Sequence, residues 1–131
     1  MSTSSRTVNV TTFRAELRRL YDVVERAALD GDLDAYLTPI AKDVVFDVHG
    51  TTGVGIDALR KTFPADFKAE LSIRSLETFL EGDTGWDWVQ MEAKGETAVM
   101  RLLYQYAHRG GRWQCVRLSY IEATAHQALL Q

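Results

Sequence analysis

The sequence contains few of the residues that could hold a fold together through covalent bonds or metal ions. Its 131 residues include one cysteine and three histidines. The single Cys115 can form no intrachain disulfide, and the histidines lack the spacing of zinc ligands. We expect Cys115 to be buried and unreactive, because it alternates with Trp113 along a predicted strand. The sequence therefore predicts no metal site and a fold that depends on its apolar core.

Long apolar runs and an excess of positive charge are also missing. No stretch approaches the roughly 18 apolar residues of a transmembrane helix, and residues 1–12 lack the apolar segment of a secretory signal. We expect a cytoplasmic protein without membrane partners, with a flexible polar arm at residues 1–12 and one domain over residues 13–131. The formal net charge is −3. No nucleic-acid partner is expected, because nucleic-acid-binding domains usually carry a basic patch.

Helical periodicity dominates the first third of the chain. Apolar residues recur there at three- and four-residue steps, which predicts an amphipathic helix over residues 13–30. Thr11 or Thr12 can cap its start, and Gly31 can supply the left-handed conformation that ends it. Two shorter helices are predicted over residues 33–37 and 56–63.

Strand signals fill the rest of the chain. Glycine-containing turns separate the later strands, so we expect antiparallel hairpins. Helices followed by such strands indicate an α+β fold. Because long strands twist and coil strongly, we expect a cone-shaped, strongly curved, mostly antiparallel sheet with N-terminal helices covering a pocket. The segment at residues 50–55 is predicted as a loop, and the strands are predicted over residues 43–49, 70–80, 86–93, 97–108 and 112–123.

Three stretches of the chain resemble one protein superfamily. Residues 20–50, LYDVVERAALDGDLDAYLTPIAKDVVFDVHG, are similar to its helix, Gly-Asp break and first strand. Residues 53–63, GVGIDALRKTF, resemble its loop-to-helix step, and residues 109–123, RGGRWQCVRLSYIEA, its last hairpin. The chain resembles the nuclear-transport-factor-2-like superfamily, which includes ketosteroid isomerases, SnoaL-type polyketide cyclases and limonene epoxide hydrolases. Over residues 13–124, the resemblance implies a pocket for a hydrophobic small molecule and a homodimer formed through the sheet.

Asp47 and His49 are the candidates for acid–base catalysis on the first predicted strand. They lie two residues apart, so their side chains share a face, and a carboxylate can fix the tautomer of a nearby imidazole. The general base of the isomerases falls on Val48 when counted from the Gly-Asp break. Asp47 therefore matches that position only after a shift of one residue, which exchanges the faces of a strand. A polar strand end that meets water is the alternative for this pair.

Tyr21 lies on the apolar stripe of the first helix. Its hydroxyl could donate a hydrogen bond to a ligand oxygen or a developing oxyanion, or it could belong to a core tyrosine. The helix tyrosine of the isomerases falls near Val24, one turn later. The catalytic set that we expect is Tyr21, Asp47 and His49.

Trp88, Tyr104 and Tyr120 are the predicted aromatic residues of the substrate pocket, and core packing is the alternative for each. Arg101 interrupts an apolar strand and could clamp a carboxylate or an enolate. A charged stripe on the convex face, or an ion pair in a dimer, is the alternative for Arg101. Glu122 matches in type the acid that ends the last strand of the superfamily, and it completes the predicted substrate-binding set.

No cofactor is expected. Residues 53–58 match the dinucleotide pattern G-x-G-x-x-A, but a meander follows them in place of further βα units. Leu103 and Ser119 stand where the isomerases and the epoxide hydrolases have acids, so neither activity transfers directly. We expect a cofactor-independent isomerase, cyclase or hydrolase that acts on a hydrophobic substrate by acid–base chemistry. A non-catalytic ligand-binding or dimerisation domain of the same fold is the alternative.

Overall fold

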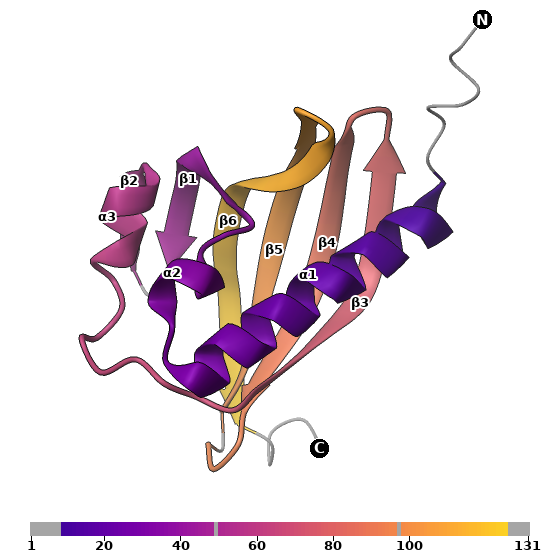
Figure 1. Cartoon of the computed structure of the whole chain (residues 1–131). Helices are drawn as coiled ribbons and strands as arrows, with labels where there is room; N and C mark the ends of the chain where they lie inside the picture. The colour runs from indigo at the N-terminus through magenta and orange to yellow at the C-terminus, as the bar shows by residue number, and fades with distance from the viewer. Residues whose placement is uncertain (1–8, 49, 97, 126–131) are drawn as a thin grey trace, which may run out of the picture.

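Helices at the N-terminal end of the chain lie across one face of a curved six-stranded sheet, which confirms the predicted α+β class (Figure 1). The computed structural model describes residues 9–48, 50–96 and 98–125, without the side chains of residues 98 and 122–125. Its helices are α1 (Val10–Asp30), α2 (Leu33–Tyr36) and α3 (Ile56–Arg60). Among the described residues, none of the helices is long and apolar enough to cross a membrane.

Helix α1 is longer at its start than the sequence predicts. Asn9 is the N-cap, and its side-chain oxygen accepts a hydrogen bond of 2.8 Å from the backbone amide of Thr12. The predicted cap at Thr11 or Thr12 is wrong, because the helix begins at Val10 and both threonines lie in its first turn, where Asn9 caps the amide of Thr12. Gly31 ends the helix as predicted, with a φ of 71°.

The sheet has the strand order β2-β1-β6-β5-β4-β3 and is curled but not closed. All neighbouring strands are antiparallel except β1 and β6, which are parallel, with Phe46 opposite Leu118. This pairing joins the first strand of the chain to the last. The strands are β1 (Ile40–Val48), β2 (Thr51–Val54), β3 (Leu71–Glu81), β4 (Thr84–Ala93), β5 (Ala98–Arg109) and β6 (Arg112–Ala125).

The sequence predicts a loop after the first strand, and this prediction is wrong because strand β2 lies there. Residues 51–54 pair with β1 in antiparallel register, and Gly53 lies opposite Phe46. A Cβ atom at Gly53 would lie 2.6 Å from the ring of Phe46, so only glycine fits beneath that ring. A strand this short is not recognisable from glycine and threonine, because neither residue provides an alternation of apolar and polar side chains.

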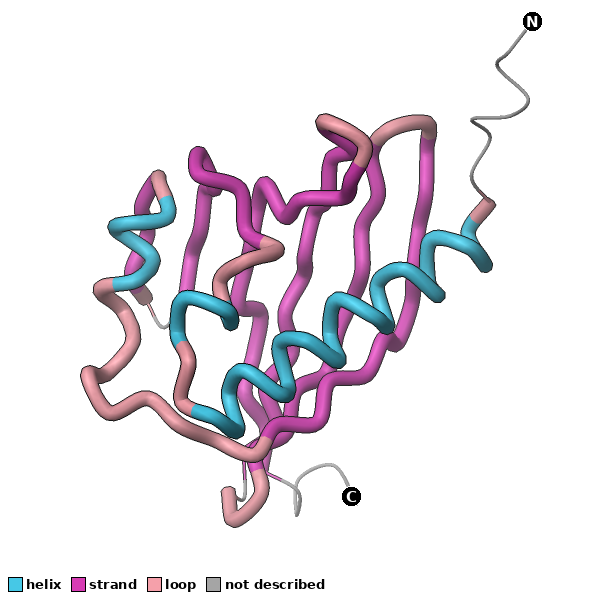
Figure 2. The backbone as a smooth tube through the Cα atoms, viewed as in Figure 1, coloured by secondary structure: helices cyan, strands magenta, loops and turns pink. Residues whose placement is uncertain are grey.

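Helix α3 is also shorter than predicted and ends at Arg60, well before Pro64. The segment that follows runs past the C-terminal end of α1 toward the start of β3 (Figure 2). Its backbone is fixed there, because the amide of Ala69 donates to the carbonyl oxygen of Ala28 at 3.0 Å. This segment therefore forms part of the wall of the space beneath α1.

Candidate functional site

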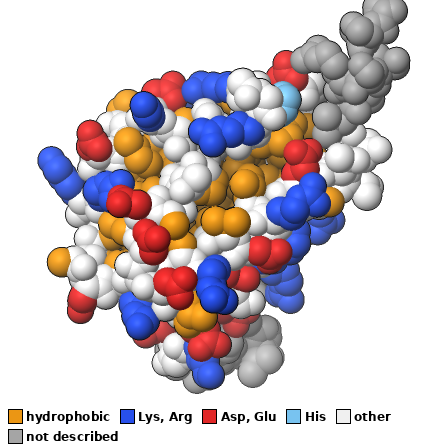
Figure 3. Space-filling model, in the orientation of Figure 1, with side chains coloured by type: hydrophobic (Ala, Val, Ile, Leu, Met, Phe, Trp, Pro, Cys, Tyr) orange, Lys and Arg blue, Asp and Glu red, His pale blue; other side chains and the backbone are white. Residues whose placement is uncertain are grey.

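A cavity of about 420 Å³ lies between the concave face of the sheet, helices α1 and α2, and the segment after α3. Its described lining is mostly apolar, and Glu96 is the only charged residue in that lining. On the face that carries the helices, hydrophobic side chains gather at the centre and charged side chains surround them (Figure 3). All five tyrosines of the chain line the cavity: Tyr21, Tyr36, Tyr104, Tyr106 and Tyr120.

A buried carboxylate lies directly behind one of these tyrosines. Asp87 on β4 is 0% exposed. Its Oδ2 atom accepts hydrogen bonds of 2.6 Å from the hydroxyls of Tyr21 and Ser75, and its Oδ1 atom accepts one of 2.7 Å from Thr78. Asp87 is absent from the lining of the cavity, so it reaches that space only through Tyr21.

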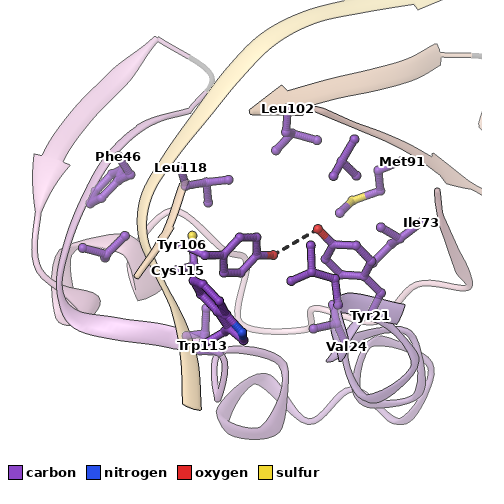
Figure 4. Close-up of a cluster of buried hydrophobic side chains, with 14 of the residues drawn as sticks. Tyr21, Val24, Phe46, Ile73, Met91, Leu102, Tyr106, Trp113, Cys115 and Leu118 are labelled. Atoms are coloured by element: carbon purple, nitrogen blue, oxygen red, sulfur yellow. Dashed lines mark hydrogen bonds between the residues drawn. The ribbon is translucent and has the colours of Figure 1, made fainter. Parts of the chain in front are cut away.

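The hydrogen-bonded chain continues from Tyr21 to a second tyrosine. The hydroxyl of Tyr106 on β5 donates to the hydroxyl oxygen of Tyr21 over 3.1 Å. Figure 4 shows the two hydroxyls pointing toward one another, with Met91 and Leu102 nearby. Tyr106, Tyr21 and Asp87 thus form a continuous path from the cavity to a carboxylate that water does not reach.

The alternation of β4 places Asp87 on the inner face. Gly85, Asp87, Val89 and Met91 are all buried on the side that faces α1, whereas Trp86 and Trp88 point to the other face. Gly85 is required at its position, because a Cβ atom there would clash with the ring of Phe13. The absence of a side chain at Gly85 therefore lets α1 approach the sheet closely, and Tyr21 can reach Asp87.

Burial raises the pKa of Asp87 above its ordinary value of 3.8. The hydrogen bonds from Ser75, Tyr21 and Thr78 act in the opposite direction, as does the positive charge of Arg14. The guanidinium of Arg14 is held close by, because it donates to the carbonyl oxygen of Ser75 over 3.5 Å. The carboxyl group is consequently a stronger base than an exposed aspartate, provided that a proton can reach it.

The hydroxyls of Tyr21, Tyr36, Tyr104 and Tyr106 stay protonated at neutral pH. Burial raises the pKa of Tyr21 well above 10.0, and the neighbouring Tyr106 and Asp87 raise it further. Burial also raises the pKa values of Tyr104 and Tyr106 well above 10.0, and that of Tyr36 to about 12. These hydroxyls can therefore pass a proton on, but none of them is a stored tyrosinate base.

Of the predicted catalytic residues, Tyr21 lines the cavity and Asp47 does not. Asp47 is exposed on the outer side of β1, in a shallow groove with Thr52, Arg117 and Ser119. The structure does not bring Tyr21 and Asp47 together. His49 lies outside the described residues.

The predicted substrate-binding residues also divide between the two faces of the sheet. Tyr104 and Tyr120 line the cavity. Trp88 is half-buried on the opposite face, and Arg101 on β5 donates to the side-chain oxygen of Gln90 over 3.4 Å, outside the cavity lining. The side chain of Glu122 lies outside the described part of the structure.

Asp87 and Tyr106 are the residues that the sequence analysis missed. A signal for Asp87 is present, because an acid occupies the inward position in a run whose other inward residues are Gly85, Val89 and Met91. The three hydroxyl donors around it come from α1 and β3, and no local pattern brings those elements together. Within the described residues, no three His, Cys, Asp or Glu side chains gather as a metal ion would require.

Comparison with known proteins places the fold and the family. The SnoaL-like domain family matches residues 17–116. An NTF2-like protein of unknown function from Shewanella oneidensis MR-1 superposes with a TM-score of 0.72 at 19% identity, covering 83% of this chain and 98% of that chain. A second one, from Shewanella baltica OS155, superposes with a TM-score of 0.69 at 10% identity, covering 90% and 98%.

A cystatin-like domain of unknown function from Nostoc punctiforme PCC 73102 superposes with a TM-score of 0.70 at 16% identity, covering 93% of this chain and 84% of that chain. At such identities the solved structures show the fold alone. No curated protein matches the chain. The family match covers most of the described domain, from the middle of α1 to β6, and the fold agrees with it. The chain belongs to the SnoaL-like domain family, and its fold is that of the NTF2-like structures.

Proposed function

We propose that this protein binds a neutral, hydrophobic small molecule in the cavity and removes or returns a proton through the chain of Tyr106, Tyr21 and Asp87. The observation that carries the proposal is the bond between Tyr21 and Asp87. A fully buried carboxylate whose pKa is raised lies 2.6 Å from a hydroxyl that lines an apolar cavity. Perturbed carboxyl groups joined to a pocket are typical of acid–base sites.

The proton transfer is balanced within the chain itself. A ligand gives a proton to the oxygen of Tyr106, while Tyr106 gives its own proton to Tyr21 and Tyr21 gives its proton to Asp87. The ligand ends with one negative charge more and Asp87 with one fewer, and neither tyrosine changes its ionisation state. The reverse movement returns the proton to another atom of the ligand, which is an isomerisation or the closing step of a cyclisation. General acid–base catalysis of this kind contributes about 10²–10⁴ to a rate.

Exchange of hydrogen for deuterium tests the proposed base. We would add 2-tetralone, an apolar bicyclic ketone with acidic α-hydrogens, to the protein in deuterated buffer and follow the loss of the α-hydrogen signal by NMR. We expect D87N to lower the protein-dependent exchange rate about 100-fold or more. D57N removes an exposed carboxylate on α3 and is the matched control.

The same experiment includes D47N, because Asp47 and His49 are the acid–base candidates predicted from the sequence. Loss of exchange in D47N with full exchange in D87N would return the assignment to Asp47. Exchange that is equal in all three variants would contradict a carboxylate base at either position.

A binding function without catalysis is the second candidate, and one observation favours it. The three hydrogen bonds that Asp87 accepts within the described structure come from side chains of the protein, and Asp87 does not line the cavity. The carboxylate could therefore serve to tie α1 and β3 to β4. Binding of 2-tetralone without any protein-dependent exchange would support this function.

We further propose a homodimer formed through the convex face of the sheet. Phe79 and Ile121 are 50% and 49% exposed, and Phe79 lies opposite Trp86 in the register of β3 and β4. Trp86 and Trp88 point to the same face. A contiguous exposed apolar patch is typical of a surface that associates with a partner.

A further inference from the structure

The polarity of the hydrogen bonds in the buried chain is fixed at its Asp87 end. An ionised carboxylate can only accept hydrogen bonds. The bonds to Asp87 from Tyr21, Ser75 and Thr78 measure 2.6, 2.6 and 2.7 Å, which are the lengths of hydroxyl bonds to a charged carboxylate. Arg14 adds a positive charge nearby. Tyr21 must therefore give its only proton to Asp87.

The bond from Tyr21 to Asp87 determines the direction of the hydrogen bond between Tyr106 and Tyr21. Since the proton of Tyr21 is used, the 3.1 Å contact between Tyr21 and Tyr106 needs the proton of Tyr106. A tyrosine hydroxyl has one proton and two lone pairs. Tyr106 consequently has no proton left for a ligand, and its oxygen can only accept. Tyr36 and Tyr104 take no part in the two hydrogen bonds that fix this direction.

The surroundings of Tyr106 make this direction important for binding. The chain meets the cavity among Met91, Leu102 and Leu118, all apolar (Figure 4). No Lys, Arg or His belongs to the described lining of the cavity. A polar ligand atom placed there loses its water, so a mismatch with the protein leaves two groups unsatisfied.

We propose, on the basis of the binding function proposed above, that the cavity selects neutral apolar molecules that carry a hydrogen-bond donor such as a hydroxyl. That hydroxyl donates to the oxygen of Tyr106. A molecule of the same shape that can only accept, such as an ether, is discriminated against at this position. The chemical class of ligand is thus an apolar alcohol, phenol or enol.

Three related probes test the selection at neutral pH. Naphthalene has no polar group, 2-naphthol has a hydroxyl donor, and 2-methoxynaphthalene has an acceptor only. Dissociation constants would be measured by NMR titration of the 15N-labelled full chain. We expect 2-naphthol to bind about 5-fold or more tightly than 2-methoxynaphthalene, which corresponds to one hydrogen bond in a desolvated site.

The variant Y21F tests whether the buried chain is the cause. Removing the Tyr21 hydroxyl releases the proton of Tyr106, which can then donate into the cavity. We expect the dissociation constant of 2-methoxynaphthalene divided by that of 2-naphthol to be several-fold lower in Y21F than in the wild type. Comparing this ratio between the two proteins cancels the difference in size between the probes. D87N is the second variant, for use if Y21F does not fold. It gives Tyr21 an amide donor as its neighbour and should lower the same ratio.

The outcomes separate this inference from the proposed function. Naphthalene that fails to bind the wild-type chain would overturn the hydrophobic-ligand function and this inference with it. Naphthalene that binds, with no advantage for 2-naphthol, would overturn the donor selection alone. An advantage that persists unchanged in Y21F and in D87N would also overturn it, because the direction would not come from Asp87.

Discussion

The hydroxyl of Tyr21 lies 2.6 Å from Oδ2 of Asp87, and this bond joins the middle of α1 to the centre of β4. Ser75 and Thr78 bind the same carboxyl group from β3. One fully buried acid therefore holds two strands and the main helix at a fixed distance. Its contribution to stability can be measured independently of any ligand.

We expect D87A to lower the free energy of unfolding by about 3 kcal/mol, because three buried or half-buried hydroxyls lose their acceptor. T78V removes one donor and should cost only about 1 kcal/mol. Urea denaturation followed by circular dichroism measures both values. A D87A variant as stable as T78V would show that Asp87 does not organise the three elements.

The pH dependence of stability has a definite sign at this residue. The pKa of Asp87 is raised in the folded state above its ordinary value of 3.8. The folded state therefore binds the proton of Asp87 more tightly than the unfolded state does. The stability that this proton contributes is greatest below pH 3.8 and is lost as the pH rises through the folded pKa. The difference in unfolding free energy between the wild type and D87N should decrease over that window.

Denaturant titrations of the wild type and D87N at several pH values check this difference, and the subtraction cancels the titration of the exposed acids. A difference that increases with pH would mean that the pKa of Asp87 is lowered by its hydrogen bonds and by Arg14, contrary to the direction given above.

Gly85 should tolerate no side chain while Phe13 remains. G85A introduces a Cβ atom that clashes with the Phe13 ring, and overpacking of this kind costs about 1–3 kcal/mol. F13L makes room for the new methyl group, so G85A should cost less in the F13L background. A double-mutant cycle of unfolding free energies measures the coupling, and strictly additive losses would argue against direct contact.

The proposed dimer depends on the convex face. F79E places a charge at one of its most exposed apolar residues and should shift the protein toward the monomer. Light scattering coupled to size-exclusion chromatography measures the mass in solution. V23E alters a 49% exposed apolar side chain on α1, on the opposite side of the sheet, and is the matched control. A wild type that is monomeric at high concentration would contradict the dimer.

Much of the fold could be predicted from the sequence, because its helices and long strands are locally encoded. The apolar stripe of α1 and the left-handed Gly31 are examples. Strand β2 could not be predicted, since the need for glycine at position 53 comes only from its contact with the ring of Phe46. The candidate site was harder to predict from the sequence than the fold. Tyr21 could be identified from its helical face, but its partner Asp87 is 66 residues away in the sequence, and only tertiary packing joins them.

The faces of the strands were the other difficulty. Trp88 and Tyr104 are both aromatic residues on predicted strands, yet only Tyr104 faces the cavity. Alternation defines two faces without saying which one is covered by the helix. The hydrogen bond from Tyr21 to Asp87 shows which face of β4 is covered by the helix.

The parallel pairing of β1 with β6 affects how the protein is made. Leu118 is the neighbour of Phe46 in the finished sheet, and β6 also completes the cavity wall through Leu118 and Tyr120. On the ribosome, β1 emerges long before β6, so the edge of β1 that pairs with β6 stays uncovered until residues 112–125 have been synthesised. The sheet therefore cannot be completed before β6 has been synthesised, and a nascent chain interrupted before residue 112 leaves the inner face of β1 open to chaperones and proteases.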